Sequence, residues 1–200
     1  MKPSKTFYAS LKKFCFFTNK FKSDNNAVAA VEFALIAPIL ILLFIGTVEI
    51  SLAISINRKV ARISSAVADL VTQSPQLTAN EVNQIIQIAE KIMYPYDNQV
   101  NITLTGIEIA GGNATSKWVC NGSGCISGGS PQNVPAAIRK DGSFLVSSVV
   151  STNHEPIVGF FNYSNGGLTD TGTTWQMQEE MFLRPRIGNN VCIAGTGAGC

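Results

Sequence analysis

The sequence contains little charge and only one histidine. Aspartate, glutamate, lysine and arginine together make up 14% of its 200 residues, and the formal net charge is +2. A nucleic-acid-binding protein usually carries a basic stripe, so nucleic acid is not expected as a partner. The single histidine, His154, limits hydrolytic chemistry, because a catalytic nucleophile needs a base and a group that orients it.

The remaining polar motifs do not predict an enzyme. His154 lies in a polar stretch and is interpreted as a surface loop residue. Glu179 and Glu180 are adjacent, so on a strand they point to opposite faces and cannot act together. No glycine motif that cradles a phosphate follows a predicted strand. We therefore expect no catalytic residue, no cofactor, no metal and no small-molecule substrate.

The cysteines are divided between the two sides of a long apolar segment. Cys15 precedes it, and four follow it: Cys120, Cys125, Cys192 and Cys200. A zinc site is the alternative to disulfides, but there is no CxxC motif and no neighbouring histidine. Disulfides in an oxidising compartment are favoured. The short loops 120–125 and 192–200 close at little entropic cost, although sequence alone leaves three pairings open.

The apolar segment, residues 27–56, is long enough to cross a membrane. As a helix it would extend about 45 Å, which exceeds a hydrocarbon core of about 30 Å. A cleaved signal sequence is the competing interpretation, but its apolar core is usually shorter. Six lysines precede the segment and fewer basic residues follow it. The sequence therefore predicts a cytoplasmic basic tail (1–26), a transmembrane helix (27–56) and an external domain (57–200).

Helical periodicity continues beyond the membrane segment. Apolar residues recur at spacings of three and four up to Pro75, which predicts an amphipathic helix ending near Ser74. Thr78 and Glu81 match a capping box at the start of a second helix. That helix is expected to bury one apolar stripe and to be closed by Pro95; the stripe comprises Val82, Ile85, Ile86, Ala89, Ile92 and Met93.

The pattern changes to strands from Gln99 onward. Alternation predicts a strand that slips at Gly106, where a β-bulge would keep Ile107 and Ile109 facing the core. Residues 117–120, 143–151, 158–163 and 173–183 are predicted strands, and 121–135 an exposed loop. The expected fold class is α+β: a long N-terminal transmembrane helix continues into a domain in which a second helix packs on an antiparallel sheet.

The segment from Ala29 to Pro38, AAVEFALIAP, followed by Gly46 and Glu49, resembles the TadE/TadG-like family of tight-adherence (Flp-type) pilus assembly proteins. Three later segments also resemble the larger family members: 67–71, 94–97 and 184–186. The resemblance implies a non-enzymatic, pseudopilin-like protein of the bacterial inner membrane with a periplasmic C-terminal domain. Its implied partners are pilins, other pilus-assembly membrane proteins and prepilin peptidase. A membrane-tethered periplasmic binding module that never joins a pilus is the alternative.

The resemblance also implies a cleavage position. In pilin-like segments a glutamate is the fifth residue after the cut, which here places the cut between Ala27 and Val28. The family usually has glycine before the cut, whereas this chain has Ala27, and large TadG-like members are not all processed. Cleavage and its absence both stay open.

Three residues of the apolar segment have predicted physical roles. A carboxylate is costly inside a membrane, so Glu32 is interpreted as a helix-pairing residue that sets the register with a neighbouring subunit. A position at headgroup depth is the simpler alternative. Pro38 removes a backbone donor and predicts a helix kink. Glu49 is expected to be a solvated residue at the outer interface.

Overall fold

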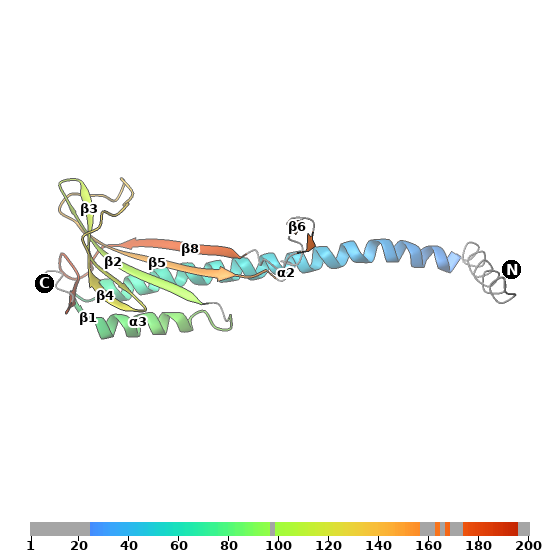
Figure 1. Ribbon diagram of the computed structural model, residues 1–200, viewed down its shortest axis with the longest axis horizontal. Helices are drawn as coiled ribbons and strands as arrows, with labels where there is room; N and C mark the ends of the chain where they lie inside the picture. Colours follow the sequence, from blue (N-terminus) through green and yellow to red (C-terminus); the bar gives the residue numbers. More distant parts are fainter. Residues whose placement is uncertain (1–24, 97–98, 157–162, 165–166, 169–173, 196–200) are drawn as a thin grey trace, which may run out of the picture. The chain divides into compact units, whose positions relative to one another are not determined.

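The computed structural model describes residues 25–96, 99–156, 163–164, 167–168 and 174–195 (Figure 1). The chain divides into two compact units, Met1–Val48 and Glu49–Cys200. Helix α2 (Asn25–Thr72) begins in the first unit and ends in the second, and it continues through Pro38 without interruption. It ends two residues before the predicted Ser74, still ahead of Pro75, which disfavours helical geometry in the residue before it.

The two parts of α2 differ in what surrounds their side chains. Within the first unit the large apolar side chains from Val28 to Val48 are exposed, apart from the half-buried Ile45, as expected for a lipid-facing helix. Within the second unit one face of α2 is completely buried in the core, through Ile56, Val60, Ile63, Val67 and Val71. The predicted change from an apolar to an amphipathic helix is therefore confirmed.

Helix α3 (Ala79–Lys91) begins at the predicted capping box. The Thr78 hydroxyl accepts a bond from the Glu81 amide, and the Glu81 carboxylate accepts one from the Thr78 amide. Val82, Ile86, Ala89 and Met93 are buried as predicted. Ile92 is 39% exposed, so its assignment to the buried stripe is wrong; Ile88, on the same side, is 64% exposed. The helix ends at Lys91, before Pro95.

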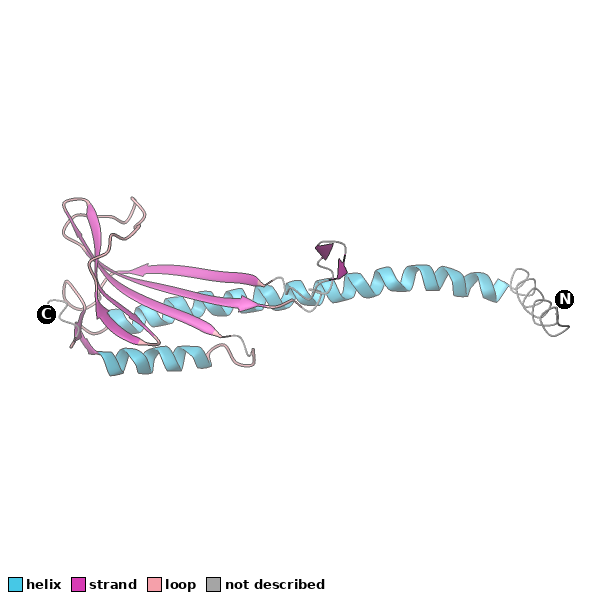
Figure 2. Ribbon diagram, viewed as in Figure 1, coloured by secondary structure: helices cyan, strands magenta, loops and turns pink. Residues whose placement is uncertain are grey.

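A five-stranded antiparallel sheet forms the other layer of the second unit, in the order β4-β3-β2-β5-β8 (Figure 2). Its strands are β2 (Val100–Ala110), β3 (Asn113–Asn121), β4 (Gly124–Ser127), β5 (Phe144–His154) and β8 (Trp175–Leu183). Alternate residues of these strands pack with α2 and α3 in one core cluster. The α+β prediction is confirmed.

The predicted bulge exists, but its location and consequence differ from the prediction. The β2–β3 register shifts after Gly106, and the extra residue is Lys117 in β3. The β2–β5 register continues unchanged, so Ile107 and Ile109 turn to the sheet face opposite the helices. There they form a second apolar cluster with Ala114, Val134 and Leu145.

Other segments also differ from the sequence prediction. Strand β4 lies inside the predicted 121–135 loop and pairs with β3. Residues 157–162, most of a predicted strand, lie outside the described residues; β6 (Tyr163–Ser164) and β7 (Gly167–Leu168) form a small hairpin. Strands β1 (Gln76–Thr78) and β9 (Cys192–Ala194) form a parallel pair that was not predicted from the sequence.

Candidate functional site

Glu32 lies on the exposed apolar part of α2. Its side chain is exposed, and so are the large apolar side chains of the following turns, including Phe33 and Ile36. In the described part of the chain Glu32 has no ion-pair partner. The carboxylate is therefore presented outward, where a second helix can reach it. Val28 is also exposed, and Ala27 lies in the same helix; neither position tests the predicted cleavage.

Within the second unit, three charged residues of α2 contact other elements of the described chain, and the first of these contacts joins Glu49 to His154. The Glu49 carboxylate lies 2.8 Å from Nε2 of His154, the last residue of β5. Glu49 is 3% exposed and His154 8% exposed. The predictions of a solvated Glu49 and a surface-loop His154 are both wrong. The strand pairing turns His154 toward the helix layer, where it meets Glu49.

The second contact holds the turn after α3. The Lys59 ammonium donates to the carbonyl oxygens of Ile92 at 3.2 Å and Met93 at 3.4 Å, and to that of Tyr94. It also lies 5.0 Å from the ring centre of Tyr96. A cation at the carboxyl end of a helix satisfies carbonyl groups that lack intrahelical donors and interacts favourably with the helix dipole.

The third contact joins segments 67–71 and 184–186, two of the three later segments that resemble the larger family members. Asp69 of α2 forms an ion pair with Arg186, whose backbone amide also donates to the Thr72 carbonyl at 3.0 Å. The Asp69 carboxylate accepts a further bond from Gln73 at 2.8 Å. Segments 67–71 and 184–186 are thus in direct contact.

These three contacts recur at intervals of ten residues along α2, at Glu49, Lys59 and Asp69. Ten residues correspond to about 15 Å of helix and a rotation of about 80°. The three contacts therefore lie on different sides of α2. They connect α2 to β5, to the turn after α3 and to the segment after β8. They fix α2 within the second unit at several points along its length.

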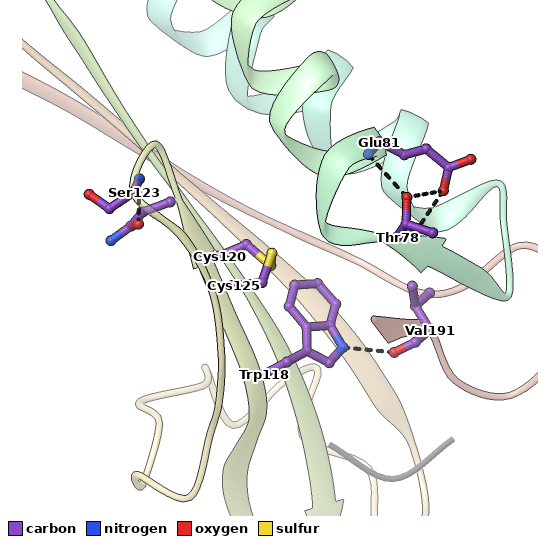
Figure 3. The surroundings of a disulfide bond; sticks show 8 residues. Thr78, Glu81, Trp118, Cys120, Ser123, Cys125 and Val191 are labelled. Carbon is purple, nitrogen blue, oxygen red and sulfur yellow. Dashed lines mark hydrogen bonds between the residues drawn. A yellow bond between two sulfur atoms is a disulfide. The ribbon is translucent and has the colours of Figure 1, made fainter. Parts of the chain in front are cut away.

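Cys120 and Cys125 form a disulfide that closes the β3–β4 hairpin (Figure 3). Next to it, the Trp118 indole donates to the Val191 carbonyl at 2.7 Å and is completely buried. Cys192 is buried in β9. Cys200 lies outside the described residues, so a Cys192–Cys200 pairing, one of those that the sequence leaves open, stays untested.

A groove of about 680 Å³ opens between α2 and β8. Its α2 wall contains the small residues Ala61, Ser65 and Ala66, and its β8 wall contains Met181 and Leu183. The charged residues Arg62, Asp69 and Arg186 complete the lining. The groove combines an apolar interior with a charged rim, an arrangement typical of protein interaction surfaces.

These features define the class of the chain: an α+β domain attached to a helix with the length and composition of a membrane span. The candidate span covers Val28–Thr72, and its most apolar window is not buried within the protein. Residues 27–69 match the family described as TadE-like protein. The match confirms the resemblance over this segment and associates the chain with Tad pilus assembly. No curated protein and no solved structure gives a significant match.

Proposed function

We propose that this protein is a non-enzymatic, pseudopilin-like component of a tight-adherence pilus assembly or secretion system. In this proposal it resides in the bacterial inner membrane, with its N-terminus in the cytoplasm and its C-terminal domain in the periplasm. The observation that carries the proposal is Glu32, an outward-facing carboxylate on the exposed apolar helix of a segment that matches the TadE-like family.

A charge within a membrane-spanning helix is costly unless it is paired. A carboxylate at the centre of a spanning helix costs about 2.5–3.5 kcal/mol on insertion scales. A cation on a neighbouring subunit removes much of this cost, but only when the two helices share one axial register. Glu32 therefore favours a particular arrangement of packed helices, which an assembly component needs and a simple anchor does not.

The buried position of the histidine supports a structural role for the domain. His154 and Glu49 shield each other from solvent, so a dissolved substrate has little access to the one imidazole of the chain. Their contact instead links the end of β5 to α2. We propose accordingly that the domain acts through its surface and not through catalysis.

Complementation of a deletion strain tests the proposal. The deletion is expected to abolish surface pili, and the wild-type chain to restore them. Glu32→Gln removes the charge with little change in size and is expected to fail, whereas Glu32→Asp keeps the carboxylate and is expected to restore pili at least in part. Normal piliation with Glu32→Gln at normal protein levels would contradict the pairing role and favour the tethered binding module.

Processing is tested separately, since pairing through Glu32 does not require it. The partners proposed here are pilins and other pilus-assembly membrane proteins, with prepilin peptidase added only if the chain is cut. N-terminal sequencing of the membrane-extracted protein distinguishes the two states. A start at Val28 demonstrates cleavage after Ala27, and a start at Met1 excludes it.

A further inference from the structure

The helix layer of the second unit covers only part of the sheet. Helix α3 packs against β3 and β4, and α2 reaches β5, where the Ser64 hydroxyl donates to the Ser148 carbonyl at 2.9 Å. Strand β8 is the outer strand beyond β5. Met181 and Leu183, on the helix-facing side of β8, are only half-buried and line the groove. Within the described part of the chain, no further helix covers the helix-facing side of β8.

The α2 wall of this groove suits the close approach of another helix. Ala61, Ser65 and Ala66 have short side chains. The Ser65 hydroxyl donates to the Ala61 carbonyl at 2.8 Å, so it is already satisfied within its own helix. The wall consequently offers a shallow surface of low polarity over about 8 Å of α2.

The same chain carries an exposed helix face of matching character on α3. Ile85, Ile88 and Ile92 lie with Glu81 within a sector of about 60°, over about 16 Å of helix. Ile88 and Ile92 are exposed and Ile85 is half-buried. We call this face, Glu81 with the three isoleucines, the α3 outer face. Ile88 and Ile92 lie about one turn apart, so together they offer an apolar contact to another helix.

Charge makes the groove and the α3 outer face complementary. Arg62 at the groove is exposed and forms no ion pair within the described residues, whereas Arg186 is engaged by Asp69. Glu81 is held in its ionised form, because hydrogen bonds from the Thr78 backbone and side chain lower the pKa of its carboxyl group. An unengaged cation borders the groove, and a stable anion lies at the end of the α3 outer face.

We propose that the groove between α2 and β8 receives the α3 outer face of a second copy of this chain, with Glu81 pairing with Arg62. The two surfaces differ, so the contact is heterologous: each copy can offer its α3 outer face to one neighbour and its groove to another. Such contacts build open chains unless their rotation closes a ring. The inference deepens the proposed function, on which it rests for its biological setting, because it supplies a filament-forming contact outside the membrane.

Directional cross-linking in native membranes tests this contact. Both chains carry Cys15→Ser to remove one background thiol. One differently tagged chain carries Ala66→Cys in the groove, and the other carries Ile88→Cys on the α3 outer face. A short bifunctional thiol reagent should cross-link the two chains when they are co-expressed. Chains that all carry Ile88→Cys should not cross-link to each other, because a symmetric contact is not expected.

Charge variants test the pairing within the same assay. Arg62→Glu on the Ala66→Cys chain is expected to lower cross-linking about fivefold, and Glu81→Lys on the Ile88→Cys chain to restore it. Lys140→Glu makes the same charge change on an exposed loop residue outside the groove and should leave cross-linking unchanged. Failure of the mixed chains to cross-link, efficient cross-linking between two Ile88→Cys chains, or insensitivity to Arg62→Glu would each overturn the proposal.

These outcomes are separable from those of the pilus proposal. If mixed chains fail to cross-link while Glu32→Gln abolishes piliation, the groove contact is wrong and the pilus role stands. If mixed chains cross-link in the predicted direction while Glu32→Gln has no effect, the contact stands and the pairing role of Glu32 is wrong.

Discussion

The Glu49 carboxylate lies 2.8 Å from the His154 imidazole, across 105 positions of sequence, and both side chains are buried. The contact joins α2 to the end of β5 where the second unit begins. A buried polar group that loses its partner keeps its desolvation cost without compensation. The pair is therefore expected to be important for the stability of this end of the domain.

Removing either partner should destabilise the domain. Glu49→Ala or His154→Ala is expected to lower the free energy of unfolding by about 3 kcal/mol, because each removes the bond between two buried polar side chains while the desolvation cost of the remaining one persists. Glu49→Gln retains a hydrogen-bonding side chain and should cost less. Urea unfolding of the full chain in detergent, followed by tryptophan fluorescence, provides the measurement. Equal stability of Glu49→Ala and wild type would show that the pair contributes nothing.

Gly106 should not tolerate a side chain. A Cβ atom there would lie 2.3 Å from the Trp118 ring, which is itself fixed by its bond to the Val191 carbonyl. Gly106→Val is expected to destabilise the domain by about 3 kcal/mol through overpacking. Gly122→Ala is the matched control, because a Cβ at Gly122 meets no atom within 4 Å. An unchanged unfolding midpoint for Gly106→Val would mean that Trp118 does not cover this glycine.

The capping box should make stability depend on pH. Since the folded state lowers the pKa of Glu81 below its ordinary value of 4.5, ionised Glu81 stabilises the fold above that value. The stabilisation is lost as the pH falls through the lower, folded-state pKa. Titrating the unfolding free energy of wild type and Glu81→Gln from about pH 6 to about pH 3 should show their difference shrinking. A difference that is constant with pH would exclude this linkage.

The N-cap itself is tested by Thr78→Ala, at neutral pH. This change removes the hydroxyl that accepts from the Glu81 amide and is expected to cost about 1 kcal/mol. Thr78→Ser keeps the acceptor and should retain most of the stability, as measured by urea unfolding. If both variants lost equal stability, the methyl group and not the cap would be responsible.

Elements whose signals lie in residues close together in the sequence were predicted correctly. The capping box identified the start of α3, and the alternation from Val100 identified β2. The Glu49–His154 contact could not be found this way, because it depends on the register of β5 against the sheet and not on either local sequence. The bulge was anticipated at Gly106, but only the partner strand determines that Lys117 is the extra residue.

Very short strands that pair with a distant part of the sequence were not predicted either, because they carry little local signal. Strands β1 and β9 contain three residues each and pair in parallel although most of the second unit's sequence separates them, so neither has an alternation long enough to recognise. The exposure of Ile88 and Ile92 also depends on which side of α3 the sheet covers. Glu32 was recognisable from sequence because a charge inside an apolar run is unusual wherever the run lies.

Helix pairing through Glu32 is tested most sharply by co-isolating partner membrane proteins with chains that carry matched Glu32 substitutions. Tagged wild-type, Glu32→Asp and Glu32→Gln chains are expressed at equal levels in the native host and purified in mild detergent, and bound pilins and pilus-assembly proteins are quantified. If Glu32 pairs helices, these proteins should be recovered with wild type and Glu32→Asp, and their recovery should fall about tenfold with Glu32→Gln, corresponding to about 1.4 kcal/mol of helix pairing. Equal recovery of these proteins with all three chains would contradict it.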